Sequence, residues 1–290
     1  MEVISLPDSE RRPRHVAVGT FDGVHLGHRE VIAGADSVLT FDPHPSVVVA
    51  PQHTPKLLTS LEVKAQLISE LAVSELIVIP FDAVFARRSA QSFIEEVLLQ
   101  KLGATRVSVG ENFRFGHRAQ GDPELLAADG RFQVDVHPLL EVEGEIVSSS
   151  HIRGLVLAGE VDQAARFLGA PFQLRGEVVH GEKRGRELGF PTANLIPSDR
   201  LVCPGHGVYA CLADGRPAAV SIGVRPTFGS GRGELIEAYL LDFEGDLYGH
   251  ELHLQFLQRL RGERRFGTPE ALVEQMHLDV QQTRKIAAAH

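Results

Sequence analysis

The sequence predicts two domains: an α/β domain built on a parallel sheet, then a small antiparallel β-barrel with a C-terminal helix. Its 290 residues are enough for about two domains. In the first part, short apolar runs alternate with segments of helical periodicity. From Phe172 onward, short strands follow one another, with turns rich in Gly, Pro and Asp between them.

The first part is expected to contain four buried strands with helical crossovers. The strands are His15–Gly19, Ser37–Phe41, Glu75–Pro80 and Arg106–Gly110. Amphipathic helices are expected over Leu61–Leu71 and Ala90–Leu102. Such alternation favours a parallel sheet, in which ligands bind beyond the carboxyl ends of the strands. The loops after these strands are therefore the expected place for chemistry.

The second part is expected to form an antiparallel barrel or sandwich. Its strands are Phe172–Val179, Gly207–Ala213, Ala218–Gly223, Ile236–Phe243 and Glu251–Leu257. The tail Pro269–Lys285 is expected to be helical. Residues 152–169 are expected to form bridging helices that belong to the first domain. The predicted boundary lies near Ala170, which gives domains 1–170 and 171–290.

Composition and charge narrow the possible partners. The chain is 43% hydrophobic and 23% charged, which is typical of a globular enzyme. Its net charge is −9, of which residues 1–170 carry −8 and residues 171–290 carry −1. This balance argues against a nucleic-acid partner, whereas a small phosphate-rich ligand needs only a few local cations.

The sequence favours a cytoplasmic protein. Its cysteines, Cys203 and Cys211, form no CxxC motif, and a reducing compartment is the simpler interpretation. The first fifteen residues lack the apolar segment of a signal peptide. No apolar run approaches the roughly 18 residues of a membrane span. No membrane partner is therefore expected, and the sequence predicts no particular oligomeric state.

The first chemical motif runs from Val18 to His28, where a predicted strand enters a glycine-containing turn and then a helix. His25 and His28 are three residues apart, so they share one face near the helix start. Glycine lets the backbone approach a ligand closely, and unpaired N–H groups at a helix start suit phosphate. A polyphosphate site is favoured, although a surface histidine pair or half of a metal site fits the spacing as well.

This stretch resembles the GxFDGVHxGH signature of bacterial bifunctional riboflavin kinase/FMN adenylyltransferases, also called FAD synthetases. The resemblance implies a Rossmann-like HxGH nucleotidyltransferase domain, in which FMN attacks ATP to give FAD and pyrophosphate. It implies that His25 and His28 are catalytic and contact the triphosphate. The residues implied to bind the nucleotide are Gly19, Phe21, Asp22 and Gly23.

Three later segments resemble further parts of the same family pattern. Residues 40–45 resemble TFxPHP. Residues 110–116 resemble GxNFRFG, which implies that Asn112 and Arg114 bind flavin. Residues 148–153 resemble SSTxIR, which implies that Ser148, Ser149 and Arg153 bind phosphate. Taken alone, each segment would be interpreted rather as a packed loop or a helix cap than as a binding site.

A cationic glycine-rich segment opens the second domain. Glycines recur every four residues between Lys183, Arg184 and Arg186, without the spacing of a Walker A motif. The segment resembles the riboflavin kinase signature GxxxGxxxGFPTANL. The resemblance implies an ATP site and a Mg²⁺ site held by Thr192 and Asn194, whose oxygens suit this ion. The ATP-binding residues implied are Gly181, Lys183, Gly185, Gly189, Thr192 and Asn194.

The strand that ends in the LLDF run carries the implied base of the kinase. Transfer of phosphate to a primary alcohol benefits from a group that accepts its proton. The resemblance assigns this role to Glu237, with riboflavin as substrate and FMN as product. It also places a GxxPTF loop at residues 223–228 on the flavin side. Arg261 stands where the family has an arginine before its final helix.

The chain departs from the family pattern after the HxGH motif. Only eleven residues separate His28 from Thr40, so a helix there can have at most about two turns. Thr20 replaces the usual Asn, and Ser150-His151 replaces Thr-Arg. A riboflavin kinase with a degenerate adenylyltransferase domain is therefore the alternative. A flavin-binding protein without turnover is the other, although binding alone needs no base such as Glu237.

Overall fold

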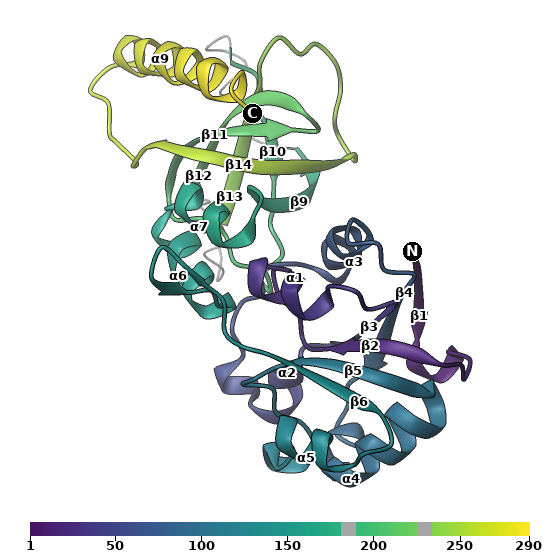
Figure 1. Ribbon diagram of the computed structural model, residues 1–290. Coiled ribbons are helices and arrows are strands. Elements are labelled where there is room, and N and C mark those ends of the chain that lie inside the picture. Colours follow the sequence, from purple (N-terminus) through teal and green to yellow (C-terminus); the bar gives the residue numbers. More distant parts are fainter. Residues whose placement is uncertain (181–189, 225–233) are drawn as a thin grey trace. The chain divides into compact units, whose positions relative to one another are not determined.

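The computed structural model describes residues 1–180, 190–224 and 234–290, and the chain divides into two compact units (Figure 1). The units are Met1–Ser149 and Ser150–His290. The division therefore falls earlier in the chain than the predicted boundary near Ala170. Of the predicted ATP-binding residues, Gly181, Lys183, Gly185 and Gly189 lie outside the described residues, as does most of the 223–228 loop.

The first unit is built on a six-stranded parallel sheet of order β1-β4-β3-β2-β5-β6. The strands are β1 (Glu2–Ser5), β2 (Arg14–Val18), β3 (Ser37–Asp42), β4 (Glu75–Pro80), β5 (Ala104–Gly110) and β6 (Gln133–His137). The four predicted strands are confirmed to within two residues. The two missed strands are the sheet edges, where exposed positions leave no long apolar run.

Helices cover both faces of this sheet. On one face, Val16 and Val18 pack beneath α4 (Ala90–Ser92) and the π-helix η4 (Phe93–Leu102). On the other face, Ala17 packs with α1 (Leu26–Ile32) and α3 (Leu61–Ser69). Short elements complete the unit, namely α2 (Pro45–Val49), α5 (Pro123–Ala128), the 3-10 turns η1 (Leu6–Asp8), η2 (Pro51–His53), η3 (Phe85–Arg87) and η5 (His117–Ala119), and the β7–β8 hairpin (Glu141–Val142, Glu145–Ile146). The unit is thus the predicted doubly wound α/β domain.

The strand order changes direction between β2 and β5. From β2 the chain builds outward through β3 and β4, whereas β5 and β6 lie on the opposite side of β2. In open α/β sheets, ligands bind beyond the carboxyl ends of the strands at such a switch point. This geometry selects the loops that follow β2 and β5 as the candidate site.

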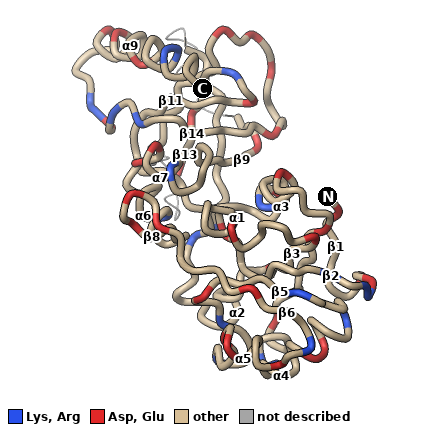
Figure 2. Tube along the Cα trace, viewed as in Figure 1, with Lys and Arg blue, Asp and Glu red and all other residues tan. Residues whose placement is uncertain are grey.

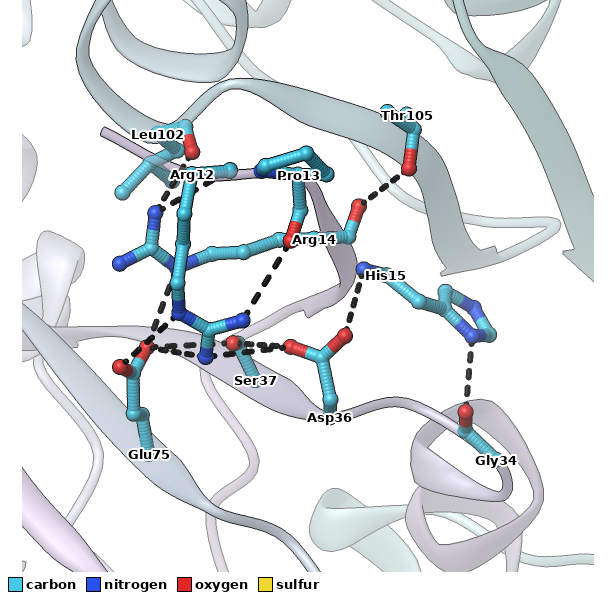
Figure 3. Close-up of polar contacts among 10 residues, drawn as sticks. All are labelled: Arg12, Pro13, Arg14, His15, Gly34, Asp36, Ser37, Glu75, Leu102 and Thr105. Atoms are coloured by element: carbon cyan, nitrogen blue, oxygen red, sulfur yellow. Dashed lines mark hydrogen bonds and ion pairs between the residues drawn. The ribbon is translucent and has the colours of Figure 1, made fainter. Parts of the chain in front are cut away.

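A buried polar network lies at the opposite, amino-terminal end of the strands (Figure 3). The Arg14 guanidinium, only 1% exposed, donates from Nε to Glu75 Oε2 at 3.1 Å and from Nη1 to the Leu102 carbonyl at 2.6 Å. Arg12 also contacts the Glu75 carboxylate. These contacts connect β2, β4 and the end of η4, so the network fixes the sheet far from the candidate site.

The second unit is a closed antiparallel barrel of order β10-β13-β12-β11-β14-β9. Its strands are β9 (Phe172–Val179), β10 (Ala193–Leu195), β11 (Gly207–Ala213), β12 (Arg216–Val224), β13 (Glu234–Leu240) and β14 (Glu251–Arg261). The predicted barrel is therefore confirmed. The predicted extension of β13 to Phe243 is wrong, because Asp242 adopts a left-handed backbone with φ of 55° and turns the chain.

Helices that precede and follow the barrel strands in the sequence pack against the barrel. The bridging segment forms α6 (Ser149–Ala158) and α7 (Val161–Leu168), and α7 contacts β9 and β14. Arg259 of β14 donates to the Ala158 carbonyl. The helices therefore pack with the second unit. The C-terminal helix α9 (Pro269–Ala287) lies against β11, β12 and β14, as the tail periodicity predicts.

Candidate active sites

Three of the sequence motifs follow neighbouring parallel strands in the first unit. The 40–45 segment begins within β3, the HxGH segment follows β2, and the 110–116 segment begins at the last residue of β5. These strands are adjacent in the order β3-β2-β5, so their carboxyl ends share one edge of the sheet. The structure therefore brings together three segments that are up to about 80 residues apart in sequence, at the position predicted for ligand binding.

The turn after β2 is held by buried contacts. A Cβ on Gly19 would lie 2.9 Å from the Phe21 ring, so this position requires glycine. The Asp22 carboxylate, 3% exposed, accepts hydrogen bonds from the backbone N–H groups of Leu58 and Thr59 at 2.8 and 3.2 Å. Gly23 has φ of 88°. These predicted nucleotide-binding residues shape the turn, and their direct contact with nucleotide stays a prediction.

His25 and His28 lie together at the start of α1. Their rings are stacked, with centroids 3.5 Å apart and planes 15° apart. His25 caps the helix, because its Nδ1 accepts a hydrogen bond from the His28 N–H at 3.2 Å. Phe21 meets the His28 ring edge-on at 5.3 Å. Among the described residues, nothing hydrogen-bonds to the buried Nδ1 of His28.

Burial makes both histidines poor bases. Desolvation lowers the pKa of His25 to about 4. It also lowers the pKa of His28 well below its ordinary value, and the charges of His25 and Lys64 act in the same direction. Both rings are thus neutral near pH 7. Because Nδ1 of His25 accepts a hydrogen bond, the proton of its neutral ring lies on Nε2, which can donate.

The helix that carries His28 is as short as the sequence predicts, since α1 has seven residues. The segment that follows this helix is nevertheless fixed by contacts with His15 of β2. The Gly34 carbonyl lies 2.9 Å from His15 Nδ1, and the Asp36 carboxylate accepts a hydrogen bond from the His15 N–H at 3.0 Å (Figure 3). The short connection is therefore anchored to β2, the same strand that leads into the histidine turn.

The predicted phosphate-binding serines begin where the first unit ends. Ser149 Oγ donates to the Asp22 carbonyl at 2.9 Å, which ties this segment to the histidine turn. Ser148 precedes it and is partly exposed. Arg153 lies on α6 within the second unit, and its contact with phosphate stays a prediction.

The predicted flavin-binding residues remain accessible after β5. Asn112 and Arg114 are both exposed, and Arg114 donates to the Phe113 carbonyl at 2.8 Å. Phe115 is buried and its backbone pairs with Gly121, where a Cβ would lie 2.6 Å from the Phe115 ring. The loop is thus closed at its base, and the two polar side chains stay free to meet a ligand.

The barrel brings the predicted kinase residues into register. Asn194 of β10 lies directly opposite Glu237 of β13, whose other neighbour is Ser221 of β12. Asn194 is 8% exposed, and its Nδ2 lies 3.4 Å from the Thr192 carbonyl. Asn194 therefore lies on the strand next to the one that carries the predicted base.

An aromatic cluster adjoins these residues, and sequence reasoning missed it. Phe190 meets Tyr239 edge-on at 5.2 Å and His277 of α9 at 5.1 Å. Tyr239 lies on the same face of β13 as Glu237, because strand side chains alternate. His277 gave no signal, because it is 40 residues from Glu237 and only the packing of α9 brings it close.

Comparison with known proteins assigns each half of the chain. Residues 8–151 match the FAD synthetase family, and residues 168–287 match the riboflavin kinase family. The bifunctional riboflavin kinase/FMN adenylyltransferase of Listeria monocytogenes is 37% identical over 290 residues, covering 94% of this chain and 92% of that protein. The chain belongs to the bifunctional riboflavin kinase/FMN adenylyltransferase family. It is an enzyme with two activities, and no comparison supports a kinase-only chain.

Further relatives agree with this family. The bifunctional riboflavin kinase/FMN adenylyltransferase of Bacillus subtilis is 36% identical, covering 92% of this chain and 90% of that protein. A crystal structure from Streptococcus pneumoniae, titled a macrolide-efflux protein, has a TM-score of 0.89 and 30% identity, and the match covers 98% of this chain and 99% of that one. That likeness supports the fold. Among the described helices, none has the length and apolarity to cross a membrane.

One departure from the family pattern, His151, and one residue that follows it, Arg261, have structural roles. His151 packs edge-on against Phe167 of α7 at 4.8 Å, so it joins the two bridging helices. Arg261 forms hydrogen bonds from Nε and Nη2 to the buried carboxylate of Asp279 on α9. The arginine before the final helix therefore attaches that helix to β14.

Acidic and basic residues are interspersed along both units of this two-activity enzyme (Figure 2). The first unit therefore offers no broad positive field for ATP and FMN, as its charge balance predicts. Recognition of phosphate must come from individual groups near the HxGH turn. A buried cation near this turn escaped sequence reasoning: Lys64 on α3 is only 7% exposed, although a lysine is ordinarily expected on a solvated face.

Proposed function

We propose that each unit carries one of the two activities, with the residues that the motifs single out. The second unit phosphorylates riboflavin with ATP to give FMN, and the first transfers an adenylyl group from a second ATP to FMN. The observation that carries this proposal is that each family match coincides with its own fold and its own cluster, His25–His28 in one and Asn194–Glu237 in the other. The functional boundary between the two domains stays near Ala170.

In the kinase, Glu237 is the base that activates the alcohol. The 5′-hydroxyl oxygen of riboflavin bonds to the γ-phosphorus of ATP as the bond to the bridging oxygen breaks, leaving FMN and ADP. The Glu237 carboxylate accepts the hydroxyl proton. Glu237 lies in the middle of β13, which pairs with β10 on one side and β12 on the other. This pairing fixes the backbone that carries the carboxylate.

The kinase residues also fit a Mg²⁺ ion. The Asn194 amide oxygen and the Thr192 hydroxyl are hard oxygen donors, which this ion prefers. Asn194 is buried and its Nδ2 donates to the Thr192 carbonyl, so the amide oxygen is the atom that would bind the ion. A bound Mg²⁺ would neutralise charge on the ATP phosphates. Among the described residues, no group of three or more His, Cys, Asp or Glu side chains forms a second metal site.

In the adenylyltransferase, the histidines act as hydrogen-bond donors. An oxygen of the FMN phosphate bonds to the α-phosphorus of ATP while the bond to the β-phosphate oxygen breaks, so pyrophosphate leaves with the electron pair. Neutral His25 donates from Nε2 to the phosphates, and the stacked His28 shares the same face. Ser149, anchored to the histidine turn, completes the phosphate contacts within the first unit, while Asn112 and Arg114 bind flavin.

The substrate ATP and the two cysteines also favour a cytoplasmic location. The use of ATP and the two buried cysteines outside any disulfide, Cys203 and Cys211, fit the cytoplasm, which we assign as the location.

Product analysis tests the two activities together. The purified chain is incubated with riboflavin, ATP and Mg²⁺, and the flavins are separated by chromatography. We expect FMN to appear first and FAD to follow, and FMN supplied alone with ATP should yield FAD. Formation of FMN without FAD in both mixtures would overturn the assignment of adenylyl transfer to the first unit.

A further inference from the structure

Lys64 places an ammonium group beneath the histidine turn. Its Nζ donates to the Thr20 carbonyl at 2.7 Å and lies 3.4 Å from Thr40 Oγ1. Thr40 Oγ1 in turn donates to the same Thr20 carbonyl at 3.1 Å. Thr20 follows β2, and Thr40 lies in β3. A single side chain from α3 therefore joins the two strands at the edge where the adenylyltransferase residues gather.

Burial and two nearby carboxylates act in opposite directions on the protonation of Lys64. Burial lowers the pKa of Lys64, whereas the carboxylates of Asp22 and Asp42 raise it. Asp22 lies in the turn itself, and Asp42 ends β3. Buried lysines are rare unless they are paired, since removing an ammonium group from water costs several kcal/mol. The two carboxylates therefore keep this site suitable for a cation.

The same cation acts on His28. The positive charge of Lys64 favours the neutral imidazole of His28, together with burial and the neighbouring ring of His25. The His28 ring contacts His25 and Phe21, and the charged groups that act on this corner of the unit are Lys64, Asp22 and Asp42. Lys64 thus couples the shape of the turn to the protonation state of a catalytic histidine.

We propose that Lys64 is a positioning residue of adenylyl transfer: its ammonium group ties the Thr20 carbonyl to Thr40 and so fixes the histidine turn in the geometry that presents His25 and His28 to ATP. The proposal explains why a lysine interrupts the otherwise apolar buried face of α3, made of Val63, Leu67 and Ile68. It also places an ammonium group of the acidic first domain beneath the histidine turn.

Two substitutions separate the charge of Lys64 from its hydrogen bonds. Lys64→Gln keeps N–H donors but removes the charge, and Lys64→Arg keeps the charge. We expect Lys64→Gln to move the acidic limb of the kcat profile of adenylyl transfer to higher pH, because loss of the cation removes one of the influences that lower the pKa of His28. Lys64→Arg should leave that limb in place even if kcat falls.

The control is Lys101→Gln. Lys101 also donates to a backbone carbonyl, that of Pro7, but lies on η4 away from the histidines, so neither kcat nor the pH profile should change. A limb that stays unmoved in Lys64→Gln, or one that moves equally in Lys64→Arg, would overturn the proposal. If the first unit fails to fold in both variants while kinase turnover stays intact, the loss of its unfolding transition would show that Lys64 serves stability alone. This result would also overturn the proposal.

This inference rests on the proposed adenylyl transfer, and the two fail in different ways. If the unaltered chain forms no FAD from FMN and ATP, the proposed function is wrong. If the unaltered chain forms FAD and only the Lys64 variants behave contrary to expectation, the proposed function stands and the role of Lys64 does not.

Discussion

The imidazole rings of His25 and His28 are stacked in parallel at the start of α1, with 3.5 Å between their centroids. Such a stack would be strongly repulsive if both rings were protonated, because two like charges would lie at contact distance in a desolvated place. Burial removes this conflict by keeping both rings neutral. The arrangement suits donation of hydrogen bonds to phosphate and excludes a cationic pair at neutral pH.

The stability of the first unit should depend on pH through His25. Its pKa is about 4 when folded and 6.5 in its ordinary state, so the unfolded chain binds more protons between these values. The unfolding free energy should therefore fall as the pH drops from 6.5 towards 4, by up to about 3 kcal/mol. Urea unfolding of the first unit at several pH values measures this. The pKa of His28 is shifted in the same direction, so His25→Gln should reduce the slope without abolishing it, and an equally steep dependence in that variant would contradict the account.

Glu75 should stabilise the sheet at the amino-terminal end of its strands. Burial tends to raise the pKa of Glu75, but hydrogen bonds from Arg14 and Arg12 hold it below its ordinary value. Glu75→Gln leaves the buried Arg14 without its counter-charge, and the first unit should lose about 3 kcal/mol. Thermal and urea unfolding check this. The matched substitution Glu95→Gln affects an exposed pair with Arg131 and should leave the transition unchanged.

Glu237 should be needed for the kinase alone. Glu237→Gln keeps the size of the side chain but cannot accept a proton, so riboflavin phosphorylation should fall by about 10²–10⁴-fold. Adenylyl transfer to supplied FMN should stay unchanged. Glu251→Gln is the control, because Glu251 also lies on a barrel strand but is exposed beside Arg175. Kinase turnover within a few-fold of normal in Glu237→Gln would show that another group takes the proton.

Gly19 should be indispensable for the shape of the histidine turn. A Cβ at this position lies 2.9 Å from the Phe21 ring, which packs edge-on against His28. Gly19→Ala should therefore displace that ring and reduce adenylyl transfer by at least about tenfold, with the kinase unaffected. Steady-state kinetics of both reactions measure the effect. Gly154→Ala, where a Cβ meets open space on α6, is the control and should be neutral or slightly stabilising.

Strong local patterns account for what the sequence predicted well. Glu75–Pro80 is a continuous apolar run, and the observed β4 has the same bounds. The two-turn length of α1 followed from the eleven residues between His28 and Thr40. The motifs also mark loops that the sheet order brings together.

The register of β10 and the burial of Lys64 could not be predicted, because both depend on contacts between residues that are far apart in the sequence. β10 has three residues, too few for a periodicity, yet its register with β13 places Asn194 opposite Glu237. Lys64 belongs to a helix whose periodicity predicts a solvated lysine as readily as a buried one. Its role depends on the Thr20 carbonyl, 44 residues away in sequence.

The separation of the two activities between the units is the central claim, and a crossed assay of two variants tests it most directly. Chain with Glu237→Gln is given FMN and ATP, and chain with both His25→Ala and His28→Ala is given riboflavin and ATP, each with Mg²⁺. We expect the first to form FAD at a normal rate and the second to form FMN but no FAD, while a mixture of both converts riboflavin to FAD. Loss of both activities in either variant would contradict the account.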